Sequence, residues 1–306
     1  MRFDIAGLIA IVGVALAAQP LNAADDDTNT KNSSESVGTD GNVLKPSSAW
    51  NADFGDEKCR LALAFGEGND RHLLYFEQFH PSHRVGFTVA GPKLKGFKEK
   101  RPVFINFGTK QKPRKTNPYV GSLDGVGKAV IYSSLRPTLR KKRTQNTRNR
   151  SRPQLDLEAA KGIGSITLNQ GHRTVTFATG DLHNPMQVLD HCAKNLLKVW
   201  GLDPDQQMAK SRSAKLVDND AVKERIRGFY PKSALRKREQ GVIRFRVMLD
   251  ETGAVTDCRL KNATELKTLQ SRACQVLSNA TFEPALDADG SPMASYYANS
   301  ISYRIN

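Results

Sequence analysis

Residues 241–260 read GVIRFRVMLDETGAVTDCRL, and this stretch decides the fold of the C-terminal part of the chain. Apolar side chains at 243, 245, 247 and 249 alternate with Arg244, Arg246 and Met248, which is the period of a half-buried antiparallel strand. Asp250-Glu251-Thr252-Gly253 predicts a hairpin turn, because Gly253 can take a positive φ. A return strand over 254–260 completes the hairpin.

The flanking residues add two helices and one more strand. A helical turn at 234–238 ends at Gly241, and apolar residues between Leu266 and Ala280 recur on one side of a predicted helix. Phe282 is expected in the core, and Asp289-Gly290 predicts a last turn before a strand at the C-terminus. The order helix, two strands, helix, strand predicts a small α+β domain.

Several short motifs occur in one order along this region: Tyr230-Pro231, Gly241, Gly253, Phe282-x-Pro284-Ala285 and Asp289-Gly290-x-Pro292. In that order they resemble the C-terminal domain of TonB-family energy transducers. The longer sequence also resembles uncharacterised exported proteins of alpha-proteobacteria that are named for a TonB-like domain, through Trp50, Cys59, Phe65-Gly66, Cys192 and Trp200-Gly201. That second resemblance brings no activity with it for the N-terminal region.

The resemblance implies a function in protein binding. In the TonB family the last strand recruits an extended peptide of an outer-membrane transporter by strand addition, which implies a transporter or another envelope protein as partner. The polar residues 299, 300 and 302 and the absence of proline leave the matching edge able to pair. The alternative is that another strand or a second copy closes this edge, giving a homodimer. The implied partner-binding residues are Tyr297, Asn299, Ile301, Tyr303 and Ile305.

The first 24 residues predict export. Met1-Arg2 is a short positive region, Ile5–Ala18 is a continuous apolar run, and Ala23-Ala24 offers a small-residue cleavage site. The run is shorter than the roughly 20 residues that a membrane-spanning helix needs. We expect a cleaved signal peptide over 1–24 and a periplasmic protein. The alternative is an uncleaved inner-membrane anchor at 5–18.

Four cysteines agree with an oxidising compartment, because no two of them form a CxxC pair. Cys258 and Cys274 fall within the TonB-like module, whereas Cys59 and Cys192 lie near the two ends of the preceding region. We therefore expect the disulfides Cys59–Cys192 and Cys258–Cys274. Four buried free thiols are the alternative.

Composition divides the chain into segments. Residues 25–49 are rich in Asp, Asn, Ser, Thr and Gly and predict a disordered linker. Residues 50–204 predict an α+β domain with a mixed, mainly antiparallel sheet, and a second linker over 205–220 leads to the TonB-like αββαβ domain over 221–306. Strands are expected at 73–79, 85–89, 103–107, 129–133, 163–168 and 173–177.

One helix is expected to cover the sheet of the N-terminal domain. It follows Asn184-Pro185, runs over 186–200 and stops at Gly201. The run 61–65 is either strand or helix, since its period does not distinguish them. The apolar side of the expected helix contains Val188, Leu189, Cys192, Leu196 and Val199.

Positive charge gathers in the N-terminal domain. The chain has a formal net charge of +15, and the run 136–152 holds eight basic residues without an acidic one. Because the protein is exported, we expect no nucleic-acid partner. A flexible solvated loop is one interpretation of the run, and binding of peptidoglycan or anionic lipid by a cell-envelope scaffold is the other.

No catalytic motif stands out. His80 and His83 flank Pro81-Ser82 at a spacing compatible with metal, but turn histidines are the commoner case and no second pair lies nearby. We predict a non-catalytic protein without cofactor or metal. A hydrolase with a site in the N-terminal domain is the alternative from a different class.

Overall fold

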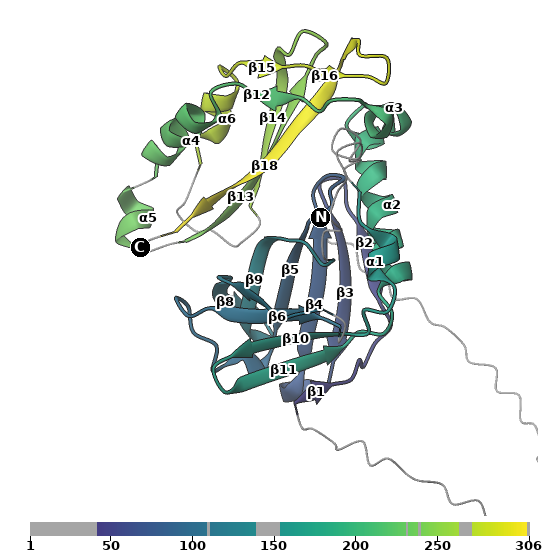
Figure 1. The fold of residues 1–306 in the computed structure, drawn as a ribbon. Helices are drawn as coiled ribbons and strands as arrows, with labels where there is room; N and C mark the ends of the chain where they lie inside the picture. Colours follow the sequence, from purple (N-terminus) through teal and green to yellow (C-terminus); the bar gives the residue numbers. More distant parts are fainter. Residues whose placement is uncertain are drawn as a thin grey trace, which may run out of the picture. The chain divides into compact units, whose positions relative to one another are not determined.

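The computed structural model describes residues 42–108, 111–138, 154–230, 232–237, 240–262 and 271–304. The expected signal peptide, most of the first expected linker and most of the basic run 136–152 lie outside these residues. The described residues form one compact unit that contains separate N-terminal and C-terminal sheets (Figure 1). The fold class is α+β, as expected.

Two sheets make up the N-terminal domain, and their neighbours pair antiparallel except for β1 and β11. The sheet β2-β3-β4-β5-β9-β8 contains β2 (Asn51–Phe54), β3 (Cys59–Phe65), β4 (His72–Gln78), β5 (Val85–Ala90), β9 (Gly127–Leu135) and β8 (Tyr119–Leu123). The sheet β1-β11-β10-β6-β7 contains β1 (Val43–Leu44), β11 (Arg173–Ala178), β10 (Ser165–Gln170), β6 (Val103–Phe107) and β7 (Arg114–Thr116). All six expected strands are present, and the ambiguous run 61–65 is part of β3.

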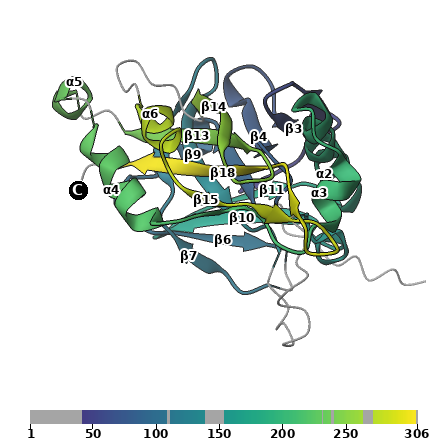
Figure 2. The same cartoon turned by 90° about the horizontal axis from the view of Figure 1, so that it is seen from above.

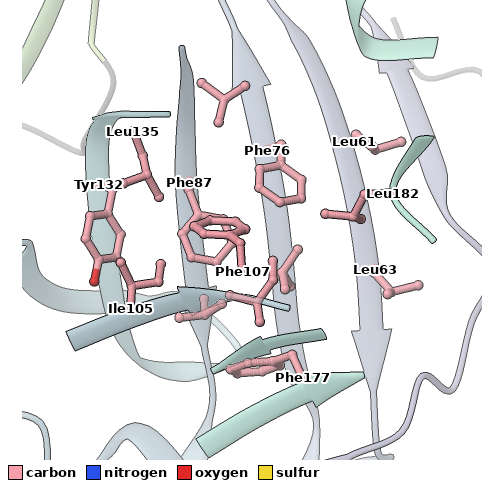
Figure 3. Packing of buried hydrophobic residues seen from close by; sticks show 14 of the residues in the cluster. Leu61, Leu63, Phe76, Phe87, Ile105, Phe107, Tyr132, Leu135, Phe177 and Leu182 are labelled. Atoms are coloured by element: carbon pink, nitrogen blue, oxygen red, sulfur yellow. The ribbon is translucent and has the colours of Figure 1, made fainter. Parts of the chain in front are cut away.

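Aromatic side chains join the two sheets. Phe87 on β5 lies 5.9 Å from Phe107 on β6 and 5.8 Å from Tyr132 on β9, ring centroid to ring centroid. Phe65 on β3 lies 5.2 Å from Phe177 on β11 in an edge-to-face pair. Figure 3 shows the rings of Phe87, Phe107, Tyr132 and Phe177 in the space between the strands. Burial of such large apolar surfaces is the main term that holds the sheets together.

Helix α2 (His183–Val199) covers the edge of this core, with α1 (Leu157–Ala160) beside it. Leu189, Cys192 and Leu196 are buried, and Cys192 is bonded to Cys59 on β3. The prediction that Val188 and Val199 share this apolar side is wrong, because their side chains are 40 % and 57 % exposed. At 3.6 residues per turn they lie beside the stripe that faces the sheet.

The C-terminal module, residues 211–304, is built around the sheet β14-β13-β18. Its strands are β13 (Gly241–Leu249), β14 (Val255–Asn262) and β18 (Ser295–Tyr303). Two short pairs flank it, β12 (Lys215–Leu216) with β15 (Phe282–Glu283) and β16 (Ala285–Leu286) with β17 (Pro292–Met293). Its helices are α4 (Asn219–Gly228), α5 (Lys232–Arg236) and α6 (Ala273–Leu277), and α3 (Pro204–Ala209) precedes them.

Strand β13 has the predicted alternation. Phe245, Val247 and Leu249 are buried in one cluster with residues of α4 and α6, while Arg244, Arg246 and Met248 are half-buried on the other face. Phe282 is buried in the same cluster, as expected. Cys258 on β14 is bonded to Cys274 on α6, so both expected disulfides are present.

The hairpin turn is held by Asp250 and Gly253. The Oδ1 atom of Asp250 accepts hydrogen bonds from the Thr252 hydroxyl at 2.7 Å and from the Ala254 amide at 2.9 Å. These bonds hold the pKa of Asp250 below its ordinary value. Gly253 has φ = 87°, and a Cβ at this position would collide with the carbonyl oxygen of Phe282. The turn therefore needs glycine for two independent reasons.

We predict that Gly253→Ala lowers the free energy of unfolding more than Gly290→Ala does. Both glycines have φ near 90°, but a Cβ at Gly290 would meet no atom within 4 Å. Gly290→Ala should therefore show only the left-handed strain of about 1 kcal/mol, whereas Gly253→Ala adds the collision with Phe282. Urea unfolding of both variants measures the difference, and equal losses would contradict the prediction.

The double substitution Cys258→Ser/Cys274→Ser should lower the free energy of unfolding by about 3 kcal/mol, because the disulfide closes a short loop of the unfolded chain. Cys59→Ser/Cys192→Ser should lower it more, since the sequence separation is 133 rather than 16. Equilibrium unfolding without reductant compares the two variants. An unchanged midpoint for either variant would count against this account.

Candidate functional site

The candidate site is the open edge of strand β18. This strand pairs antiparallel with β13 on one side, from Tyr303 opposite Gly241 to Ser295 opposite Leu249. Within the described ranges no strand pairs with its other side. Its nine residues contain neither a charged side chain nor proline. A long, uncharged edge of this kind is free to accept another strand.

Four of the five predicted site residues lie on β18 with their side chains on the face that packs against the helices. Tyr297 lies between Phe245 and Phe282, at ring distances of 6.0 Å and 5.4 Å. Ile301 is half-buried beside the same cluster, and Asn299 is exposed. Ile305 lies outside the described residues.

Tyr303 has a packing environment of its own. It is buried against Tyr230 at a ring distance of 5.0 Å, and its hydroxyl lies 3.0 Å from the Ser271 hydroxyl. Burial raises the pKa of Tyr303. The buried side chain of Tyr303 therefore fixes the end of β18. The main chain of Tyr303 is the part of this residue that faces β13 or the open edge.

The main-chain groups at the open edge belong to residues that are not among the five predicted partner-binding residues. The Ser300 amide donates a 2.8 Å hydrogen bond to Oδ1 of Asn299 in an exposed position, which places this amide at the edge. The main-chain N–H and C=O groups of successive residues point to alternate sides of a strand. Those of Ala298 and Ser302 therefore point to the open edge, as those of Ser300 do. These residues can be identified by counting every second residue along β18 from a position whose pairing with β13 is known.

The beginning of β18 is anchored by α3. Gln207 donates from Nε2 to the carbonyl oxygen of Ala294 at 2.8 Å, and its Oε1 accepts from the Ser295 hydroxyl at 2.7 Å. The Lys210 ammonium lies 4.8 Å from the ring centroid of Tyr296, and burial lowers the pKa of Lys210 to about 8. These contacts fix the position of the strand before the exposed residues begin.

Arginine side chains cover the face of the sheet opposite the helices. The guanidinium of Arg244 lies 4.4 Å from the ring centroid of Phe79, and that of Arg246 lies 4.1 Å from Trp200. Burial lowers the pKa of Arg244 to about 10. Nearby His80, predicted as an exposed turn histidine, is partly buried with a ring distance of 6.1 Å to Tyr296, and desolvation lowers its pKa to about 4. This face is already in contact with other side chains, unlike the edge.

Other kinds of site find little support in the parts of the chain that the structure describes. Those parts contain no group of three His, Cys, Asp or Glu side chains able to hold a metal ion. No helix among them combines the length and the apolar character needed to cross a membrane.

Comparison with known proteins gives a match at the C-terminal end of the chain. Residues 227–305 match the family model described as Gram-negative bacterial TonB protein C-terminal. Neither the curated proteins nor the solved structures contain a match to the chain. Domains of this family are non-catalytic and bind outer-membrane transporters, and together with the disulfides they indicate the cell envelope. Residues 227–305 are thus a TonB C-terminal domain, whereas the region before them has no assigned family.

Proposed function

We propose that this protein binds an extended peptide of an outer-membrane transporter, or of another envelope protein, by strand addition at the open edge of β18. The observation that carries the proposal is the edge itself: nine residues, paired on one side, without charge or proline. Main-chain hydrogen bonds to the peptide would supply affinity, and side chains beside the edge would supply selectivity. The match to the TonB C-terminal domain supports this choice of partner.

The exposed part of β18 defines where the peptide pairs. Ser295 and Tyr296 are buried and Gln207 holds this end, while residues 298–302 are half-buried or exposed. The Ser300 amide donates a hydrogen bond to Oδ1 of Asn299, and an incoming strand has to replace this bond. The exchange of one hydrogen bond for another costs little, because both states satisfy the donor.

We predict that Ser302→Pro abolishes peptide binding, whereas Ser302→Ala leaves the affinity nearly unchanged. Proline removes the amide donor that points to the open edge, and alanine keeps it. Ser302 is exposed, so neither change disturbs the core. The measurement is titration of the mature full-length chain with transporter plug peptides, read from amide chemical shifts over 297–304. Binding of the proline variant at wild-type affinity would overturn strand addition at this edge.

Pairing of β18 with a second copy of the chain is the competing use of the same edge. In that case the wild-type protein sediments as a dimer, Ser302→Pro makes it a monomer, and added peptide leaves the shifts unchanged. The titration described above thus separates a peptide-binding edge from a self-pairing edge.

We further propose that the protein is released into the periplasm after cleavage of its signal peptide. The mass of the purified protein should correspond to a chain that begins near Ala24, because Ala23-Ala24 follows the apolar run Ile5–Ala18. A mass that includes Met1, with the protein in the inner-membrane fraction, would contradict release. It would instead support an anchored transducer.

A further inference from the structure

A groove runs beside the proposed peptide-binding edge, on the face of the sheet that carries the helices. It has a volume of about 180 Å³ and is bounded by α4 on one side and by residues 299–302 of β18 on the other. In both views α4 lies beside the C-terminal half of β18 (Figures 1 and 2). The apolar side chains at its base are Leu216, Val222, Ile226, Phe245, Leu277 and Ile301.

The position of α4 follows from its sequence. Val222 and Ile226 are one helical turn apart, are buried to 7 % and 4 % exposure and belong to the core cluster of the module. Lys223 directly follows Val222, and Arg227 directly follows Ile226. The two basic side chains therefore line the groove at its rim and reach water. The same helix therefore supplies both an apolar wall and a basic rim.

Most of the wall made by α4 lies before the residues that match the family model. The match begins at residue 227, whereas α4 spans Asn219–Gly228, so Val222, Lys223 and Ile226 all precede it. The edge strand itself lies within the match.

We infer that this groove receives one large apolar side chain of the strand that adds to β18, with an acidic residue of the same peptide at the basic rim. The inference rests on the proposed strand addition. Alternate side chains of an added strand would point to the helix face, directly over the groove beside 299–302. The volume suits one leucine-sized or phenylalanine-sized side chain, whose burial replaces water on apolar walls.

The charges at the rim of the groove favour an acidic residue next to the apolar residue of the bound peptide. Lys223 and Arg227 are the charged side chains that line the groove, and both are basic. Lys223 pairs with Asp220 at 3.2 Å, but this pair is exposed and holds the lysine weakly. In the described part of the chain no carboxylate forms an ion pair with Arg227. A carboxylate of the peptide therefore complements the rim.

The acidic preference is tested with Arg227→Glu and its matched control Arg225→Glu. Both arginines are exposed and lie in the last turn of α4, but only Arg227 lines the groove. The probes are short threonine-rich peptides that carry one leucine and, next to it on the same face of the strand, glutamate, glutamine or lysine. The wild-type chain and Arg225→Glu should bind the glutamate peptide severalfold more tightly than the lysine peptide. Arg227→Glu places a carboxylate beside Lys223 at the rim and should remove this preference.

The apolar anchor is tested by replacing the leucine of the peptide with alanine. In the wild-type chain this should weaken binding about tenfold, as expected for the loss of one buried leucine side chain. In Ile226→Ala, which widens the groove, the same replacement should weaken binding clearly less, and circular dichroism checks that the variant is folded. Equal effects in both chains would place the leucine elsewhere.

The outcomes separate this inference from the proposed function. In one outcome, peptides bind and Ser302→Pro abolishes binding, but neither Arg227→Glu nor the leucine replacement has the stated effect. This outcome would support strand addition and contradict the assignment of the groove. If no peptide of the set shifts the amides of 297–304 in the wild-type chain, both fall together.

Discussion

The period-two alternation of β13 is the constraint on which the C-terminal module depends. Ile243, Phe245, Val247 and Leu249 all point to the helix side, so α4, α6 and Phe282 can pack only there. Since β18 pairs antiparallel with β13 and opposite residues share a face, the same alternation fixes which β18 side chains meet the helices. It also fixes which main-chain groups remain at the open edge. A shift of one residue in the pairing would exchange both sets at once.

Strong periodic patterns made most of this fold predictable. The β13–β14 hairpin, six strands of the N-terminal domain and helix α2 follow from alternation, β-branched runs and helical spacing. Strands β2, β7 and β8 escaped prediction because they carry few buried side chains, and their place is set by neighbouring strands. Strand β1 lies in the segment 25–49 that was expected to be a disordered linker, and this prediction is wrong at Val43–Leu44 because pairing with β11 orders the two residues. Val188 and Val199 were assigned to the wrong side because hydrophobicity alone does not tell a buried position from one at the margin of a stripe.

The sequence predicted which strand forms the candidate site, but not which main-chain groups of that strand lie at the open edge. Tyr297, Asn299 and Ile301 lie on β18 as expected, yet strand addition uses the main chain of the residues between them, and this parity depends on the register with β13. The position of helix α4 could not be predicted from the sequence. Its place beside β18 depends on contacts between residues far apart in the sequence, such as Ile226 with Phe245 and Leu277, which periodicity does not encode.

Charge is used differently at the two ends of the molecule. In the N-terminal domain the carboxylate of Glu77, with a side-chain exposure of 8 %, pairs with Lys58 at 2.8 Å and Arg60 at 2.7 Å, so part of the positive charge serves the fold. Strand β18 carries no charge at all, although charged side chains are the usual protection of an edge against pairing. A chain that keeps such an edge open is at risk of self-association. Lys223 and Arg227 of α4 lie beside the edge rather than on it, where they can favour one kind of incoming strand without preventing the pairing.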